Sequence, residues 1–269
     1  MNSIKYANLI TSCNLAHEAG FKAVEISVPK LKDFLGSGFK INDVIELLKI
    51  NELSPVCVND IFGVESIRPE ERRRIISEME FLAPITQQIG CHTLQVCPLC
   101  ELEELSWPEI VRLTAKNLRA LADMAMPYDI RIQLETMAWS PVCSLKRCLQ
   151  VLEEVGRPNT GISIDYWHLW SGGETTPDEL AKLDKNLICN IHFCDGKRPE
   201  DKAHWVDETI LRAYYPGEGD IPLKEWTEAV KATGYDGPYS AELISGVHWQ
   251  YDTRSVVQKL YASLSKYID

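Results

Sequence analysis

The chain has 269 residues, of which 45% are hydrophobic and 25% are charged, and its formal net charge at pH 7 is −11. It is long enough to bury one large core, and it has no apolar run of roughly eighteen residues, the length that would indicate a membrane span. Because the acidic residues are spread along the chain, we expect neither a nucleic-acid partner nor a membrane-surface role, but a small-molecule substrate.

Short runs rich in Val, Ile and Leu alternate along the chain with longer segments of helical periodicity. These runs predict eight strands, each followed by a helix. The expected strands cover residues 4–8, 22–27, 54–59, 92–97, 130–135, 160–165, 187–193 and 239–243. This repetition predicts a single (β/α)8 TIM barrel over residues 1–269, with its chemistry at the C-terminal ends of the strands.

Start and stop signals mark several of the predicted helices. Residues 74–89 place apolar side chains on one stripe, and Pro84 within this segment should kink the helix. Residues 106–109 and 176–179 each match a capping box with proline at the first helical position. Four glycines follow helical stretches, where a left-handed residue is expected: Gly20, Gly90, Gly156 and Gly234.

The longest irregular region covers about residues 195–220, between the last two predicted strands. It combines Gly and Pro with aromatic and charged residues, among them Lys197, Arg198, His204 and Trp205. A long loop of this composition in a compact fold is usually functional or mobile. We therefore expect an active-site loop here, within one domain that no linker divides.

Nine cysteines are scattered over the chain. An odd number without a targeting signal indicates reduced thiols, used mostly as small core residues, in a cytoplasmic protein. Cys97 and Cys100 have CxxC spacing, but they lack the second pair or the histidines of a zinc site. The sequence is also compatible with a homo-oligomer.

Four consecutive predicted strands end in side chains that can bind a metal ion: Glu135, Asp165, His192 and Glu242. Neighbouring strands lie roughly 4.8 Å apart, so inward side chains at four adjacent ends can converge on one point. Three carboxylates there would repel one another unless a cation lay between them. Three oxygens and one imidazole nitrogen suit one divalent ion, with Mn²⁺ as first choice and Co²⁺, Zn²⁺ or Mg²⁺ as alternatives.

A cation at this point suits the removal of a proton next to a carbonyl. The metal would stabilise the enediolate, while a carboxylate within about 3 Å takes the proton. Glu135 and Glu242, on strands that flank the site, are the candidates for this catalytic role. Return of the proton to the neighbouring carbon gives an isomer, and return to the opposite face of the same carbon gives an epimer.

Further side chains are candidates for lining the substrate pocket. Trp139 and three other tryptophans crowd the loops near the predicted metal, where aromatic walls exclude water and pack against sugar carbons, although each can equally be ordinary packing. His248 follows the last predicted strand and could reach the substrate. Glu25 and Asn59 could line the pocket or cap an element.

Several segments, mostly in the C-terminal half, resemble the xylose-isomerase-like sugar isomerase and epimerase barrels, and within them most closely the 2-keto-myo-inositol isomerases. These segments are LET (134–136), IDYWH (164–168), IHFCD (191–195), YPGEG (215–219) and AEL (241–243). The resemblance implies a metal-dependent isomerase or epimerase of a small keto-sugar or ketoinositol, with the same four ligands and with the two ligand glutamates as acid and base.

The resemblance also implies two substrate contacts. His168 matches a common histidine near the metal, and Arg212 roughly matches an arginine that contacts the substrate. Arg212 lies one residue further from the following Pro-Gly pair than the family pattern has it, and the loop after His192 is longer. Both departures fall where substrate choice is made.

Other functions remain open from the sequence. A lyase of the 3-dehydroshikimate dehydratase type would use the same enolate to expel a hydroxyl, with Arg212 as a carboxylate anchor. An endonuclease-IV-like phosphodiesterase would need more metals, more histidines and a basic track, which six histidines and a charge of −11 disfavour. A non-catalytic barrel subunit would be marked by the loss of a ligand, and all four are present.

Overall fold

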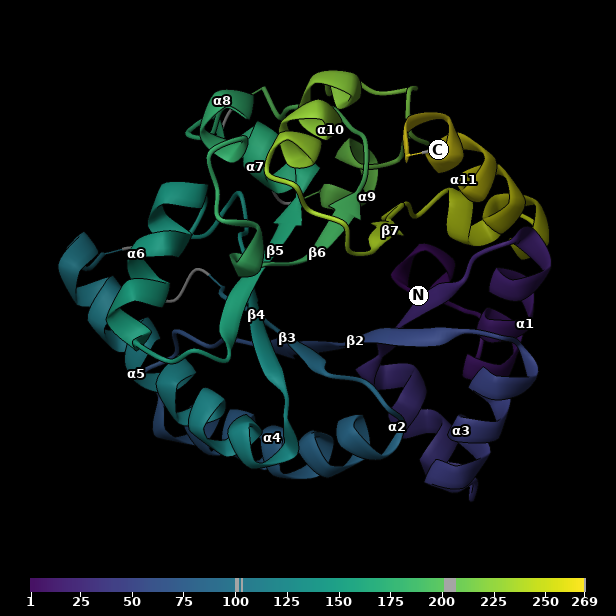
Figure 1. The fold of residues 1–269 in the computed structure, drawn as a ribbon, viewed down its shortest axis with the longest axis horizontal. Helices are drawn as coiled ribbons and strands as arrows, with labels where there is room; N and C mark the ends of the chain where they lie inside the picture. Colours follow the sequence, from purple (N-terminus) through teal and green to yellow (C-terminus); the bar gives the residue numbers. More distant parts are fainter. Residues whose placement is uncertain (100–101, 103, 201–206, 269) are drawn as a thin grey trace.

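The computed structural model describes residues 1–99, 102, 104–200 and 207–268. Within these residues seven strands form one sheet in chain order, and every neighbouring pair is parallel. They are β1 Ala23–Ser27, β2 Ser54–Phe62, β3 Thr93–Cys97, β4 Arg131–Glu135, β5 Thr160–Asp165, β6 Ile188–Phe193 and β7 Tyr239–Ala241. The sheet curls into a nearly closed barrel, and the helices surround it (Figure 1). This is the predicted TIM-barrel architecture.

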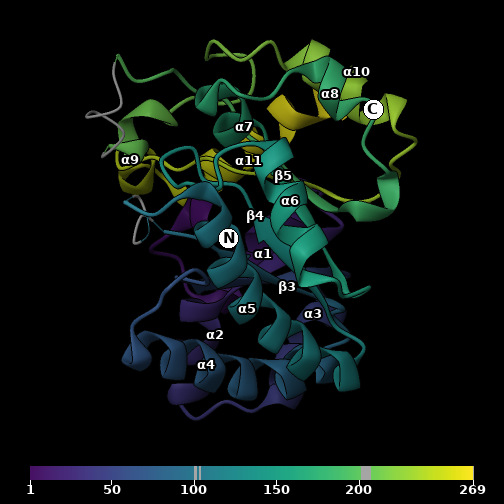
Figure 2. The ribbon, with the colours of Figure 1, turned by 90° about the vertical axis from the view of Figure 1, so that its left-hand side faces the viewer.

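Helices follow the strands around the barrel. They are α1 Leu9–Ala19, α2 Val28–Gly36, α3 Ile41–Ile50, α4 Pro69–Gln88, α5 Trp107–Ala125, α6 Leu145–Val155, α7 Tyr166–Gly172, α8 Pro177–Leu180, α9 Glu208–Leu211, α10 Leu223–Ala232 and α11 Thr253–Ile268. Figure 2 shows α4, α5 and α6 next to one another over one side of the barrel. The first and last long helices, α1 and α11, contact each other in the outer layer (Figure 1).

The first predicted strand, residues 4–8, does not form, so the expected count of eight strands was wrong for the described residues. A parallel barrel strand is buried on both faces, whereas Tyr6 in this segment is 68% exposed. Asn8 instead ends the segment as the N-cap of α1, and its side-chain oxygen accepts from the Thr11 N–H at 2.8 Å.

A side chain links this N-terminal segment to the last strand. Residues Asn2–Ile4 form a short 3₁₀-helix, and the Ser3 hydroxyl donates to the Ala241 carbonyl at 3.3 Å. The same hydroxyl oxygen accepts from the Leu243 N–H at 3.0 Å. Ser3 thus supplies the edge of β7 with two of the hydrogen bonds that a neighbouring strand would otherwise make.

The other local predictions are mostly confirmed. The capping boxes form at the starts of α5 and α8, and α4 starts five residues earlier than expected and runs through Pro84. All four glycines predicted to follow helices have positive φ angles. The eight cysteines that the structure describes form no disulfide with one another, and Cys100 of the CxxC pair lies outside the described residues. In the described part of the chain no helix has both the length and the apolar character to cross a membrane.

Side chains that alternate along each strand face either the apolar core under the helices or the interior of the barrel, where the site lies. In β4, Ile132 and Leu134 are fully buried and belong to the main apolar cluster of the protein. Gln133 and Glu135 lie between and after them, so they point to the other face, into the barrel. The apolar face therefore holds the helices in place, while the opposite face is free to carry polar groups.

The segment between β6 and β7 is organised by one carboxylate. The Asp195 side chain accepts hydrogen bonds from four backbone N–H groups: those of Gly196, Gly217, Gly219 and Ile221. A Cβ atom at Gly219 would collide with this carboxylate, so glycine is required there. The end of the predicted active-site loop, residues 217–220, is thereby tied to the end of β6, whereas His204 and Trp205 lie outside the described residues.

Candidate metal centre

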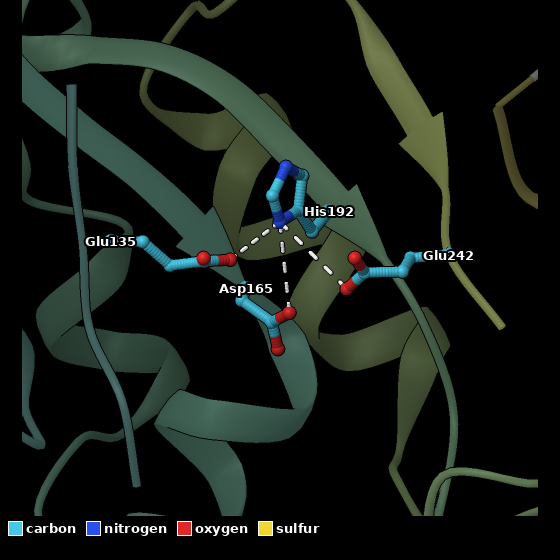
Figure 3. Close-up of side chains that lie close together, drawn as sticks. All are labelled: Glu135, Asp165, His192 and Glu242. Atoms are coloured by element: carbon cyan, nitrogen blue, oxygen red, sulfur yellow. Dashed lines mark hydrogen bonds and ion pairs between the residues drawn. The ribbon is translucent and has the colours of Figure 1, made fainter. Parts of the chain in front are cut away.

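The structure brings the four predicted ligands to one point at the mouth of the barrel (Figure 3). They are Glu135, Asp165 and His192 at the ends of β4, β5 and β6, and Glu242, which follows β7. One ligand atom from each lies within 4.8 Å of all the others. His192 Nδ1 is central: it is 2.5 Å from a Glu135 oxygen and 3.8 Å from an oxygen each of Asp165 and Glu242.

These residues fit a divalent cation. Three carboxylates and one imidazole nitrogen form an oxygen-rich donor set, and Glu242, the least buried of the four, has a side chain only 14% exposed. Three carboxylates packed this closely cost free energy unless positive charge lies among them. Their role as ligands stays a prediction, but the geometry it requires is present.

Arg212 lies inside this cluster rather than at its rim. It follows α9, and its Nη2 donates to Asp165 Oδ2 at 2.8 Å and also to Glu242. Its Nη1 donates to Glu208 at 2.6 Å, and the side chain is almost fully buried. The guanidinium therefore neutralises part of the negative charge of the cluster. A role in substrate binding stays a prediction.

The surroundings shift the pKa values of the carboxyl groups in opposite directions. Burial raises the pKa of Glu242 to about 8, and Arg212 only partly opposes this. Burial acts in the same direction on Asp165, but there Arg212, His168 and His192 together outweigh it and hold the pKa well below its usual value. For His192 burial favours the neutral ring, yet the surrounding carboxylates dominate and raise its pKa well above the usual value.

His168 and Trp139 lie beside the cluster, as the sequence predicts. The backbone N–H of Ala138 lies 3.2 Å from His168 Nδ1 and donates to it when the ring is neutral. Burial lowers the pKa of His168 and favours this neutral form. Nε2 is 3.2 Å from Nη1 of Arg212, and the ring of Trp139 meets the His168 ring edge-on.

His248 contacts a serine and two tyrosines. Its Nδ1 is 2.7 Å from the Ser245 hydroxyl, and its ring packs edge-on against Tyr215 and Tyr251. Its proposed contact with the substrate stays a prediction.

A polar layer lies beneath the four ligands. Each ligand has a polar residue two positions earlier in its strand or segment: Gln133, Ser163, Asn190 and Ser240. Because side chains two apart share a strand face, this spacing places them in the barrel interior. Gln95 on β3 joins the layer, and its Nε2 donates to Glu135 at 2.8 Å. This two-residue spacing is visible in the sequence and indicates the layer.

Glu25 is the member of this layer with the most direct effect on the cluster. Its carboxylate is 3.1 Å from Nε2 of His192, on the side of the ring away from the other carboxylates. Asn190 and Asn59 donate side-chain hydrogen bonds to Glu25 at 2.7 and 2.9 Å. Glu25 therefore fixes the imidazole with Nδ1 directed at the centre. Glu25 and Asn59 also line a cavity together with Glu242, so the pocket-wall role considered from sequence agrees with the structure.

We expect Glu25→Gln to weaken divalent-metal binding by about 10- to 100-fold, because the amide does not hold the ring with Nε2 protonated as a carboxylate does. Isothermal titration of metal-free protein with Zn²⁺ and Mn²⁺ measures this change. Glu153→Gln, at an exposed position of α6, is the matched control and should bind metal as the wild type does. Equal affinities in the two variants would contradict the positioning role of Glu25.

Comparison with known proteins agrees with this architecture. The model of the xylose isomerase-like TIM barrel family matches residues 13–262. An inosose isomerase of Halalkalibacterium halodurans is 23% identical over 260 residues, which is 95% of this chain and 90% of that protein. A 3-dehydroshikimate dehydratase of Pseudomonas aeruginosa is 26% identical over 229 residues, 84% of this chain but only 34% of that protein.

A solved structure shows the same fold. The crystal structure of the IolI protein with a bound zinc atom superposes with a TM-score of 0.91 at 22% identity, and the match covers 100% of this chain and 97% of that one. Since the family model covers nearly the whole sequence, the chain belongs to the xylose isomerase-like TIM barrel family.

Proposed function

We propose that this protein is a divalent-metal-dependent isomerase of a small polyhydroxy ketone, a keto-sugar or ketoinositol, and that it moves a proton next to the carbonyl. The convergence of three carboxylates and one imidazole within 4.8 Å carries this proposal. The similarity to inosose isomerases over 95% of the chain supports the substrate class.

The two glutamates are suited to different parts of the proton transfer. Glu135 is held by Gln95 and by His192, whereas Glu242 has Arg212 as its main partner and is the more exposed of the two. They approach His192 from opposite sides (Figure 3). A substrate between them would present one face to each, so one carboxylate could remove a proton and the other could return one.

The remaining groups would position the substrate. Nε2 of His168 and Nη1 of Arg212 lie 3.2 Å apart beside the cluster, where an oxygen of the substrate could accept from the guanidinium. The ring of Trp139 packs on His168 and shields it. A divalent cation, when bound, would supply the positive charge that stabilises an oxyanion next to the reacting carbon.

The test is solvent-deuterium incorporation. Protein reconstituted separately with Mn²⁺, Co²⁺, Zn²⁺ or Mg²⁺ is incubated in deuterated water with 2-keto-myo-inositol, with ketoses and with 3-dehydroshikimate. We expect deuterium at the carbon next to the carbonyl and the appearance of an isomer, both seen by NMR, and neither in chelator-treated protein.

Two results would contradict the proposed isomerase activity. An ultraviolet-absorbing aromatic product from 3-dehydroshikimate would identify the protein as a lyase, the activity named for the Pseudomonas relative. Failure of every metal-loaded form to exchange deuterium with any of these ketones would contradict the isomerase proposal.

A further inference from the structure

A cavity of about 700 Å³ opens beside the metal centre at the mouth of the barrel. The segment before α1, the start of α2, the end of β2 and residues after β7 form its walls. None of the four proposed ligands is among its lining residues, so it is a compartment next to the centre and distinct from it. It is large enough for the parts of a sugar-sized molecule that do not react.

Asp60 connects this cavity to the centre. It lies near the C-terminal end of β2 and lines the cavity. Its Oδ2 is 3.5 Å from the Cys97 thiol, which in turn is 3.4 Å from Oε2 of Glu135. One thiol therefore separates the Asp60 carboxyl from a proposed ligand and catalytic group. The sequence did not indicate Asp60, because the predicted strand ends at Asn59.

The hydrogen-bonding capacity of Asp60 is largely unused. Among the residues that the structure describes, the Cys97 thiol, a weak donor, is its hydrogen-bond partner, and no Lys, Arg or His forms an ion pair with it. The Asp60 side chain is half-buried and lines the cavity, so a donor that enters the cavity can reach the carboxyl. Burial raises its pKa to about 7.

The cations that line the cavity are engaged elsewhere. Lys30 is buried, and its three ammonium protons are taken by the carbonyls of Ile4 and Ala7 and by the Ser12 hydroxyl. The Lys5 ammonium lies over the Trp249 ring at 4.7 Å. Asp60 thus faces the cavity as an acceptor that no described cation neutralises, an arrangement that suits a neutral donor such as a hydroxyl group.

We propose that Asp60 is a specificity-determining residue that accepts a hydrogen bond from a substrate hydroxyl remote from the reacting carbonyl. This inference rests on the proposed function. It restricts the substrate class to ketones that carry at least one further hydroxyl, placed so that it reaches toward the ends of β1 and β2 when the substrate is bound. The Cys97 thiol keeps the carboxyl directed along the line between the cavity and Glu135.

The experiment compares two probes that share the reacting group. 2-Keto-myo-inositol carries hydroxyls around its whole ring, whereas 2-hydroxycyclohexanone carries only the one beside the carbonyl. We expect Asp60→Ala to weaken binding of the ketoinositol to metal-loaded protein by about 10- to 100-fold and to change binding of 2-hydroxycyclohexanone by less than about 2-fold. Isothermal titration gives both dissociation constants, and atomic emission gives the metal content, which should be unchanged.

Two variants serve as comparisons. Asp60→Asn keeps a carbonyl acceptor and should recover part of the loss. Asp236→Ala removes an exposed acid just before β7, outside the lining of this cavity, and should bind both probes as the wild type does.

The outcomes separate the two proposals. An equal loss for both probes, no loss for either, or loss of bound metal in Asp60→Ala would overturn the role given to Asp60. Binding that depends on Asp60 without any deuterium exchange would contradict the isomerase proposal alone. If wild-type protein binds no ketoinositol at all, both proposals fail.

Discussion

Replacement of His192 by alanine should leave the protein without bound metal and lower the rate of deuterium exchange at least about 1,000-fold. His192 supplies the nitrogen of the proposed donor set and lies within 3.8 Å of all three carboxylates. Its removal also leaves Glu25 without the imidazole that it positions. Atomic emission after dialysis measures the metal, and NMR in deuterated water measures the exchange.

His92→Ala is the matched control for this experiment. His92 is exposed before β3, at the opposite end of the barrel from the centre, and its ring contacts Asp129. This variant should retain metal and activity. A His192→Ala protein that kept one metal ion per chain and the wild-type exchange rate would show that the centre does not work as proposed.

Replacement of Glu242 by glutamine tests proton transfer separately from metal binding. Glutamine keeps an oxygen that can face a cation, but it cannot accept or return a proton. We therefore expect kcat for deuterium incorporation to fall about 10²- to 10⁴-fold at saturating metal, while metal still binds. Steady-state rates at several metal concentrations distinguish a loss of affinity from a loss of proton transfer.

Glu218→Gln provides the comparison, because Glu218 is an exposed acid of the same loop region and pairs with Lys259. It should not alter kcat. An unchanged kcat in Glu242→Gln would mean that Glu135, or a group outside the pair, handles both proton steps.

The four proposed ligands could be predicted because their geometry depends on local rules. Each ends a strand of a repeated βα unit or follows it directly, and parallel neighbours in register bring such ends together. The pairing of Asp165 with His192 across β5 and β6 shows this rule directly. The capping boxes of α5 and α8 were equally predictable, since all of their groups lie within four consecutive residues.

The contacts that the sequence did not reveal are those that cross the barrel. Glu25 on β1 meets His192 on β6, two residues 167 positions apart, and no spacing pattern links strands that are not neighbours. The register of β2 against β3 shifts between Val58 and Ile61, so a simple two-residue alternation does not place Asp60. Arg212 enters the cluster from a loop, where neither periodicity nor register applies.

The first strand was mispredicted for a different reason. Ile4 suited a strand, but the capping preference of Asn8 and the exposure of Tyr6 favour the start of a helix. In so short a segment, the one apolar side chain of Ile4 does not stabilise a strand against the helix that begins after Asn8.

The four proposed ligands come from β4 to β7 and the residue that follows, whereas the adjoining cavity is built largely from chain segments before β3. These two sets of positions can therefore vary independently during evolution. A mutant library restricted to the cavity walls would explore new sugars while leaving the reactive machinery intact. In a fold that serves many metabolic roles, such modularity offers a short route from one specificity to another.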